Sequence, residues 1–307
     1  MKIAMMGSGG VGGYFGGRMA AAGADVSFIA RGQHLETIRK NGLRISSRDM
    51  GNTLVHPTTA TDNPMAVGPV DYVIVGVKLW DTVEAGKAIL PMLGSDTTVL
   101  SLQNGVECDH ILSQTVGADR LIAGAAFIAS SIAEPGVIKH IGTMQRIVIG
   151  EIGGGSSPRV MALQEAMLAG DITAEVSDDI ERTIWEKFVF LVGLSATTSL
   201  MRTTIGPIRK DSDSRAFLGS IFAEAIAVGR ARGIEFEPDF EAARLEFIDG
   251  LPFDMTSSMH HDLEAGNPLE VAWLSGAVVR FGRELGISTP ANQVVFAALK
   301  SKAAPGP

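Results

Sequence analysis

Short, almost continuously apolar runs alternate with amphipathic stretches along the first half of the chain. Runs that suit buried strands cover residues 2–6, 25–30, 70–77, 98–102 and 121–128, with shorter ones at 138–140 and 146–150. Helical periodicity predicts helices over 13–22, 82–90 and 158–168. Strands that alternate with helices in this way are typical of a doubly wound parallel sheet.

The pattern changes after Val176. Helices are predicted over 177–201, 214–232, 239–247 and 268–285, with no convincing strand among them. Ser177, which two aspartates follow, is a typical helix start. The sequence therefore predicts an α/β domain over residues 1–176 and an all-α C-terminal domain over residues 177–307. The tail, 303–307, is expected to fray.

A glycine-rich turn, Gly7-Ser8-Gly9-Gly10-Val11-Gly12, joins the first predicted strand to the first helix. Gly-x-Gly-x-x-Gly in this context is the fingerprint of a dinucleotide site in a Rossmann-like domain. The first glycine permits the tight turn, the second lets a pyrophosphate approach the backbone, and the third lets the helix pack on the strand. The helix N-terminus offers N–H groups to the phosphates. The alternative is a glycine-rich turn that binds no ligand.

Arg31 ends the second predicted strand and indicates which dinucleotide binds. An NAD site usually has an acidic residue about 20 residues beyond the glycines, where it accepts a hydrogen bond from the ribose 2′-hydroxyl. This chain has no acid between Phe28 and Gln33. A guanidinium pairs well with a 2′-phosphate, so we expect NADP(H) rather than NAD. Otherwise Arg31 is a solvated loop cation.

Composition and charge narrow the class of protein. The chain has 307 residues, 46% of them hydrophobic and 20% charged, which is enough for a sizeable core. Its net charge of −8 and the lack of a basic run make nucleic acid a poor partner. Cys108 is the only cysteine, which suits a reducing compartment. With no secretory signal and no apolar run of about 18 residues, we expect a cytoplasmic enzyme that has no membrane partner.

Three further side chains are candidates for chemistry. Lys78 and Asn104 directly follow predicted strands, and ligands of open α/β folds bind outside the carboxyl ends of strands. Lys187 lies in a strongly apolar helix, where partial burial would lower the pKa of its amine and suit it to general acid catalysis. The plainer alternatives are a turn residue for Asn104 and solvated cations for both lysines.

The segment from Thr256 to Glu270 carries several polar groups before and after a Gly-Asn-Pro break. Ser257, Ser258 and Asp262 precede the break, and Glu270 is expected in the first turn of a new helix, where a carboxylate is favoured. The adjacent histidines, His260 and His261, project in different directions and have no distant partner cluster. We therefore expect no metal site.

These motifs together resemble the ketopantoate reductases (2-dehydropantoate 2-reductases) over nearly the whole chain. The shared features are the glycine turn, Arg31, Val77-Lys78, Gln103-Asn104-Gly105, Trp185-x-Lys187 and Ser257-Ser258-Met259-x-x-Asp262 followed by Glu270. The spacing from Ser258 to Glu270 is the most specific of them. The resemblance implies NADPH-dependent reduction of a 2-keto acid to a 2-hydroxy acid, as in pantothenate biosynthesis.

The resemblance also implies roles for individual residues. Lys187 would be the general acid, and Glu270 would accept a hydrogen bond from a substrate hydroxyl. Asn104 and Ser258 would bind the substrate carboxylate and its neighbours, and Lys78 would lie beside cofactor and substrate. Cofactor contacts are thus expected from Gly7, Ser8, Gly9, Gly10, Val11, Gly12, Arg31, Lys78, Asn104 and Glu270. The helical domain would bind substrate and support a possible homodimer.

The chain departs from the family on the face of the Lys187 helix. The family typically has asparagines four and eight residues after the lysine, where this chain has Leu191 and Ser195, and another where it has Ser275. Leucine removes an amide's donors and acceptor, so this wall becomes apolar. A bulkier, less hydroxylated 2-keto acid is therefore a candidate substrate, with Ser195 or Thr198 supplying the missing polar contacts.

Two other functions remain open at this stage. The chain could be a regulatory protein that binds NADP(H) without catalysis, although Lys187, Ser258 and Glu270 argue against it. It could also be an oxidative 3-hydroxyacid or sugar-acid dehydrogenase of similar two-domain form. The block from Ser258 to Glu270 disfavours that alternative.

Overall fold

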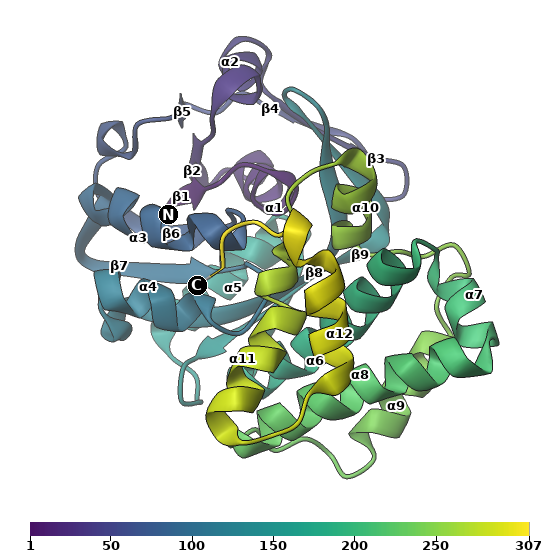
Figure 1. Cartoon of the computed structure of the whole chain (residues 1–307). Coiled ribbons are helices and arrows are strands. Elements are labelled where there is room, and N and C mark those ends of the chain that lie inside the picture. The colour runs from purple at the N-terminus through teal and green to yellow at the C-terminus, as the bar shows by residue number, and fades with distance from the viewer. Residues whose placement is uncertain (307) are drawn as a thin grey trace. The chain divides into compact units, whose positions relative to one another are not determined.

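The computed structural model describes residues 1–306 and divides into two compact units, Met1–Thr183 and Ile184–Pro307 (Figure 1). The first unit is an α/β structure and the second is built from helices. The predicted fold class, a Rossmann-like doubly wound sheet followed by an all-α domain, is confirmed. The roles predicted for the two domains stay predictions.

The first unit is organised around one large sheet. Its strands are β1 Lys2–Met6, β2 Asp25–Ile29, β3 Leu43–Ser47, β4 Thr53–Val55, β5 Thr59–Thr61, β6 Val70–Val75, β7 Leu93–Ser101, β8 Leu121–Glu134, β9 Val137–Glu151 and β10 Thr173–Val176. They are ordered β4-β3-β9-β8-β7-β6-β1-β2-β5, and β10 pairs with β9. The pairs β3/β4 and β8/β9 are antiparallel. All the other neighbouring pairs, including β3/β9 and β9/β10, are parallel.

Side chains of the central strands alternate between two cores. Ile3 and Met5 of β1 belong to one cluster, whereas Ala4 and Met6 belong to another. Helices α1 (Gly10–Ala21) and α5 (Pro158–Ala169) contribute to the first cluster. Helices α3 (Thr82–Ala88) and α4 (Cys108–Val116) contribute to the second. A strand buried on both faces has to be apolar throughout, which explains the continuous runs in the sequence.

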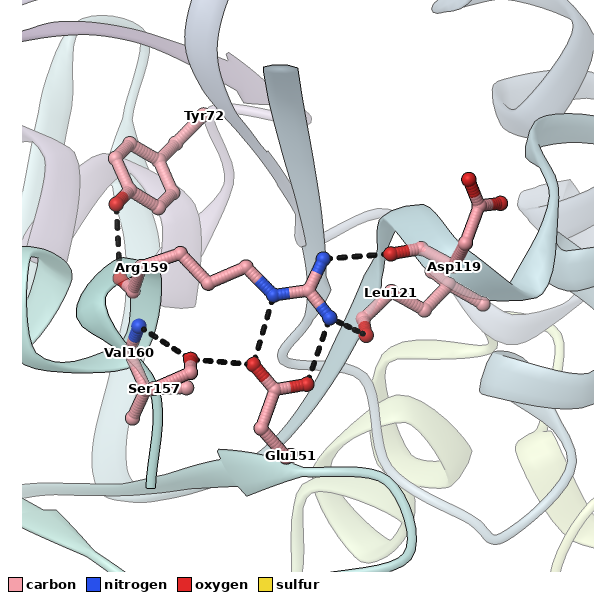
Figure 2. A network of polar contacts seen from close by, with 7 residues as sticks. All are labelled: Tyr72, Asp119, Leu121, Glu151, Ser157, Arg159 and Val160. Atoms are coloured by element: carbon pink, nitrogen blue, oxygen red, sulfur yellow. Dashed lines mark hydrogen bonds and ion pairs between the residues drawn. The ribbon is translucent and has the colours of Figure 1, made fainter. Parts of the chain in front are cut away.

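A network of hydrogen bonds lies in the first unit where β9 leads into α5 (Figure 2). Arg159 binds both carboxylate oxygens of Glu151, at 2.7 and 2.6 Å, and also donates to the Asp119 carbonyl at 2.6 Å. The Arg159 hydrogen bond lowers the pKa of Glu151. The Ser157 hydroxyl donates to Glu151 and accepts from the Val160 N–H, so it caps α5.

The second unit contains helices and short 3₁₀ turns, with no strand over residues 184–306. The elements are α6 Ile180–Met201, which begins in the first unit, α7 Ile205–Lys210, α8 Ser212–Ala231, α9 Phe240–Asp249, α10 Ser258–Ala265, η5 Glu270–Ala272, α11 Ser275–Leu285, α12 Pro290–Leu299 and η6 Lys300–Lys302. Helix α8 packs against α7, α9, α11 and α12. At Gly193 of α6, a side chain would overlap the Phe222 ring of α8, so these two helices are closely packed.

Several predicted boundaries were wrong. The helix predicted over 268–285 is interrupted, because Leu274 has φ −105° and ψ −100°, and Glu270 lies in η5 rather than in α11. The two short strands near 138–150 are one long strand, β9, which pairs with β8. Helix α1 begins at Gly10 rather than at residue 13. Strands β3, β4 and β5 were not predicted.

The C-terminal tail is also better ordered than expected. Leu269 exchanges backbone hydrogen bonds with Lys302 and Ala304, both at 2.9 Å, and the Trp273 indole donates to the Pro305 carbonyl at 3.1 Å. The prediction that residues 303–307 fray is therefore wrong as far as residue 305, and Pro307 lies outside the described residues. The tail is held because it supplies partners to backbone groups around η5.

Helix α6 is the one helix within residues 1–306 that is long and apolar enough to cross a membrane. Glu186 and Lys187 interrupt its apolar sequence, which is why no uninterrupted run was found. Of its most apolar window, 61% is buried inside the structure. A core helix of a soluble protein has the same properties.

Candidate active site

The glycine turn lies where the polypeptide leaves the central strand β1 and enters α1. Gly7 has φ +98°, which favours glycine, and a Cβ there would also lie 2.8 Å from the Val77 side chain. A Cβ on Gly12 would overlap the Gly7 carbonyl oxygen, so only glycine lets α1 approach the strand this closely. Gly9 differs, because a Cβ there would meet no atom within 4 Å. The packing of the turn therefore does not require a glycine at position 9.

The N-terminus of α1 follows directly. Gly9 is its N-cap residue and Gly10 and Val11 are its first residues, with neither a side-chain cap nor an acid in the first turn. Free backbone N–H groups at this end form a positive site for an anion. The open side of Gly9 and these N–H groups fit a dinucleotide pyrophosphate.

Ser8 is buried within the turn and fixes it to the neighbouring strand. Its hydroxyl donates to the Ile29 carbonyl at 3.0 Å, and its own N–H and that of Gly7 donate to the same oxygen. The Ser8 carbonyl accepts from the His34 imidazole at 2.9 Å. The hydroxyl of Ser8 is thus a structural group in this structure, and the predicted cofactor contact at this residue would come from its backbone.

Arg31 is exposed and stands at the N-cap of α2 (Gly32–Asn41), two residues beyond β2. Within residues 1–306 its guanidinium makes no hydrogen bond or ion pair. The structure therefore leaves this cation available to a ligand, which is what a 2′-phosphate contact requires. Its position relative to the glycine turn is fixed by β2, whose last carbonyl holds the turn.

Lys78 and Asn104 follow β6 and β7, and Gln103 ties their segments together. The Gln103 amide donates to the Val77 carbonyl at 3.1 Å and to the Thr82 hydroxyl at 2.8 Å. Lys78 is exposed, with its ammonium 5.6 Å from the Trp80 ring centroid, and Asn104 is half-buried. The structure thus brings both predicted residues to the same edge of the sheet. Sequence reasoning assigned no role to Gln103, although the Gln-Asn-Gly run contained it.

Asp109 is a buried carboxyl that the sequence did not single out. It lies in the first turn of α4, and its Oδ1 has no hydrogen-bond partner within residues 1–306. Burial, together with the charge of Glu181, raises its pKa to about 7. Because the folded pKa exceeds the unfolded value, this carboxyl favours the native state at acid pH and costs stability as the pH rises towards 7. Such groups concentrate at functional sites, and Asp109 lies close in sequence to Asn104.

In the second unit, one face of α6 carries four candidate residues. Lys187, Leu191, Ser195 and Thr198 recur at helical spacing, with the first two half-buried and the last two buried. The Thr198 hydroxyl donates to the Leu194 carbonyl at 2.6 Å and lies 3.1 Å from the Ser257 hydroxyl. Thr198 is therefore occupied by internal bonds. Ser195 is the better candidate for a substrate contact.

Ser257 and Ser258 have different environments. Ser257 is buried and caps α10, since its hydroxyl accepts from the His260 N–H at 3.1 Å. The His260 ring also bonds the Thr198 carbonyl at 2.8 Å, so the start of α10 is tied to α6. Ser258 is exposed at the first position of α10, where its hydroxyl can meet a ligand. Glu270 is 7% exposed at the start of η5.

No group of three or more His, Cys, Asp or Glu side chains in the described part of the chain is arranged to hold a metal ion. His260 instead makes internal contacts, including one with the Glu264 carboxylate at 3.2 Å. His261 bonds the Thr256 hydroxyl at 2.7 Å. Both histidines thus have ordinary structural partners.

Family comparisons cover both units. The family model described as ketopantoate reductase PanE/ApbA matches residues 3–154, and the model for the C-terminal part of the same family matches residues 179–303. A 2-dehydropantoate 2-reductase of Mesorhizobium japonicum is 32% identical over 321 residues, which cover 98% of this chain and 97% of the relative.

Solved structures are similar to this chain over nearly its whole length. The crystal structure of a PanE/ApbA family ketopantoate reductase from Ralstonia eutropha JMP134 has a TM-score of 0.90 and 32% sequence identity, with 98% of each chain covered. A D-mandelate dehydrogenase, solved as a ternary structure with NADH and anilino(oxo)acetate, has a TM-score of 0.89 at 22% identity, again with 98% of each chain covered. The D-mandelate dehydrogenase therefore shares the fold of this chain.

The open side of Gly9 gives a direct test of a dinucleotide site. We expect Gly9→Ala to fold with an unchanged melting temperature, because the methyl group meets no protein atom. The same methyl would obstruct a pyrophosphate, so the Kd for NADPH should rise about ten-fold or more. Gly219→Ala, in helix α8 with only ordinary contacts to Leu245, is the control. Equal NADPH binding by both variants would favour a turn that holds no ligand.

Proposed function

This chain is a member of the ketopantoate reductase family, and we propose that it reduces a 2-keto acid to the 2-hydroxy acid with NADPH. The resemblance predicted from the sequence is confirmed, and so is the enzyme class, an oxidoreductase acting on CH–OH groups. The observation that carries the proposal in the structure is the glycine turn with its open Gly9, together with Arg31, which lies two residues beyond β2 and has no hydrogen-bond or ion-pair partner within residues 1–306.

The proposed cofactor contacts divide by chemistry. The turn Gly7–Gly12 and the N-terminus of α1 would bind the pyrophosphate, and Arg31 would bind the 2′-phosphate. Lys78, Asn104 and Glu270 would bind the remainder of the dinucleotide, which follows from the family. The D-mandelate dehydrogenase of the same fold was solved with NADH, so the preference for NADPH rests on Arg31.

The proposed chemistry assigns one task to each substrate-binding residue. When bound, a nicotinamide would supply the hydride, which the carbonyl carbon of the substrate accepts. The Lys187 ammonium donates a proton to the carbonyl oxygen that becomes the hydroxyl. Asn104 and Ser258 orient the carboxylate and its neighbours, and the Glu270 carboxylate accepts a hydrogen bond from a substrate hydroxyl. Retention of these groups argues against a protein that only binds NADP(H).

The substrate itself is the second point of the proposal. Ketopantoate is the family substrate, and its reduction would place the enzyme in pantothenate biosynthesis. On α6, however, Leu191 offers no hydrogen bond and Thr198 is engaged with Leu194 and Ser257. Besides Lys187, this leaves Ser195 as the polar group of that face that we expect to contact substrate, so we favour a 2-keto acid with fewer hydroxyl groups. We place the reaction in the cytoplasm, which suits a chain whose single cysteine, Cys108, can form no internal disulfide.

Arg31→Ala tests the choice of cofactor. The variant should bind NADPH about 10- to 100-fold more weakly, because a charge-assisted contact to the 2′-phosphate is lost, while NADH affinity stays the same. Cofactor fluorescence titration measures both constants. Arg48→Ala, at another exposed arginine of the first unit, is the control. An equal loss for NADPH and NADH would remove Arg31 from phosphate recognition.

Lys187→Ala tests the proton donor. Turnover should fall about 100-fold or more, because a positioned general acid contributes about that much, while NADPH affinity is retained. The measurement is NADPH oxidation over a panel of 2-keto acids, run in parallel with NADH. Lys300→Ala, at an exposed lysine after α12, should keep the wild-type rate. A near-normal rate in Lys187→Ala would end its catalytic assignment, and a wild-type enzyme that binds NADPH but reduces no 2-keto acid would favour the binding-protein alternative.

Leu191→Asn combined with Ser195→Asn tests the substrate preference. Ketopantoate and 3,3-dimethyl-2-oxobutanoate differ only by the hydroxyl group, so their kcat/KM ratio isolates its recognition. We expect the double variant to shift this ratio towards ketopantoate by about ten-fold, because the new amides bind the hydroxyl. Unchanged ratios would mean that this face of α6 does not set specificity.

A further inference from the structure

His34 joins three segments of the first unit that are distant in sequence. It lies in α2 and is half-buried, with one ring nitrogen, Nε2, 2.9 Å from the Ser8 carbonyl oxygen in the glycine turn. The other, Nδ1, accepts a hydrogen bond from the Gly136 N–H at 3.0 Å, in the tight connection between β8 and β9. One side chain therefore bridges α2, the glycine turn and the β8–β9 connection.

These partners define the tautomer. An N–H group can only donate, so Nδ1 is the acceptor facing Gly136. A carbonyl can only accept, so Nε2 carries the proton and donates it to Ser8. The bridge therefore uses the neutral imidazole. Burial lowers the pKa of His34, against the opposing effect of the bond to Ser8, which is consistent with the neutral form.

The β8–β9 connection is itself closely fitted to α2. Gly136 has φ +77°, and a Cβ there would lie 2.6 Å from the Thr37 side chain of α2. Its carbonyl accepts from the Arg44 N–H at 2.9 Å, at β3. The Gly136 N–H is thus held at a fixed place. Because it binds His34, it fixes the imidazole that in turn binds the Ser8 carbonyl of the glycine turn.

The other end of the bridge lies at the peptide that precedes Gly9. The Ser8 N–H and hydroxyl are already fixed by the Ile29 carbonyl, so the Ser8 carbonyl is the group through which the turn can still be rotated. His34 binds that carbonyl. It also lies one helical turn after Arg31, which caps the same helix. His34 therefore connects the segment expected at the 2′-phosphate to the turn expected at the pyrophosphate.

We propose that His34 is a positioning residue for the dinucleotide, which holds the Ser8–Gly9 peptide and the start of α2 in the arrangement that binds the cofactor. It does this through one hydrogen bond that Nε2 donates and one that Nδ1 accepts, and without contact to the reacting atoms. The proposal rests on the proposed function, because it presumes a dinucleotide at the glycine turn.

Three substitutions separate the two hydrogen bonds. His34→Leu removes both. His34→Asn has an amide at the reach of Nδ1, so it keeps the Gly136 bond and loses the Ser8 bond. His34→Gln extends to the reach of Nε2 and keeps the Ser8 bond. His110→Leu, at an exposed histidine of α4, makes the same chemical change elsewhere in the first unit.

We expect the Kd for NADPH to rise about ten-fold in His34→Leu and in His34→Asn, and to return towards the wild-type value in His34→Gln. Hydrogen exchange of the cofactor-free full chain should be faster over residues 7–12 in the first two variants and close to wild type in the third. The His110→Leu variant should match wild type in both measurements. Asn and Gln are both polar and similar in size. A folding defect common to all three His34 variants would therefore not restore NADPH affinity in His34→Gln alone.

Several results would overturn the proposal. One is an unchanged NADPH affinity in His34→Leu, and another is a glutamine variant that binds no better than the asparagine variant. A lower affinity without faster exchange over residues 7–12 would also count against it. A wild-type protein that binds neither NADPH nor NADH would instead refute the proposed function, and the exchange data would still decide whether His34 orders the turn.

Discussion

The carbonyl oxygen of Ile29 accepts three hydrogen bonds from the glycine turn, and the geometry of the cofactor half depends on this convergence. The donors are the N–H groups of Gly7 and Ser8, at 3.2 and 3.1 Å, and the Ser8 hydroxyl at 3.0 Å. A single strand end thus fixes the turn and, two residues later, Arg31. The backbone of the glycine turn and the backbone of Arg31 are therefore held in a fixed relation by the end of β2. Preorganisation of this kind reduces the entropy that binding costs.

Most of the sheet could be predicted because its strands are buried on both faces. Such strands must be apolar throughout, so β1, β6 and the start of β8 are visible as runs in the sequence. Strands β4 and β5 lie at the edges and β3 is next to β4, where one face can be polar, and their short mixed sequences carried no signal. The break between η5 and α11 was missed for a related reason. It lies close to Leu269, which pairs with Ala303 of the C-terminal tail in a contact over more than thirty residues.

The residues of the candidate site likewise divide into those that the local sequence reveals and those that it does not. Gly7 and Gly12 could be identified because local backbone geometry dictates the residue type and spacing, and Arg31 because it follows the second strand of the motif. The residues that sequence reasoning missed act through distant contacts. Gln103 reaches across to the β6 loop, His34 reaches Gly136, and Asp109 owes its raised pKa to burial that no local pattern encodes. Ser257 is intermediate, because a serine before a helix is a recognisable cap but its contact with Thr198 is not.

The two halves of the proposed reaction place different demands on the chain. The proposed cofactor site relies on backbone groups and on Gly7 and Gly12, whose replacement would produce steric overlap, so this part tolerates little change. The proposed substrate contacts lie along one face of α6, and that helix is held by its other face, where Gly193 packs on Phe222. Leu191 can therefore replace an amide without disturbing the packing of α6. The cost falls only on a substrate whose hydroxyl loses its partner, and a less polar 2-keto acid does not incur it. In the proposed reaction, hydride chemistry and substrate choice are in this sense separable within one fold, so a chain can keep Lys187 and Glu270 while the polar groups on this face of α6 differ.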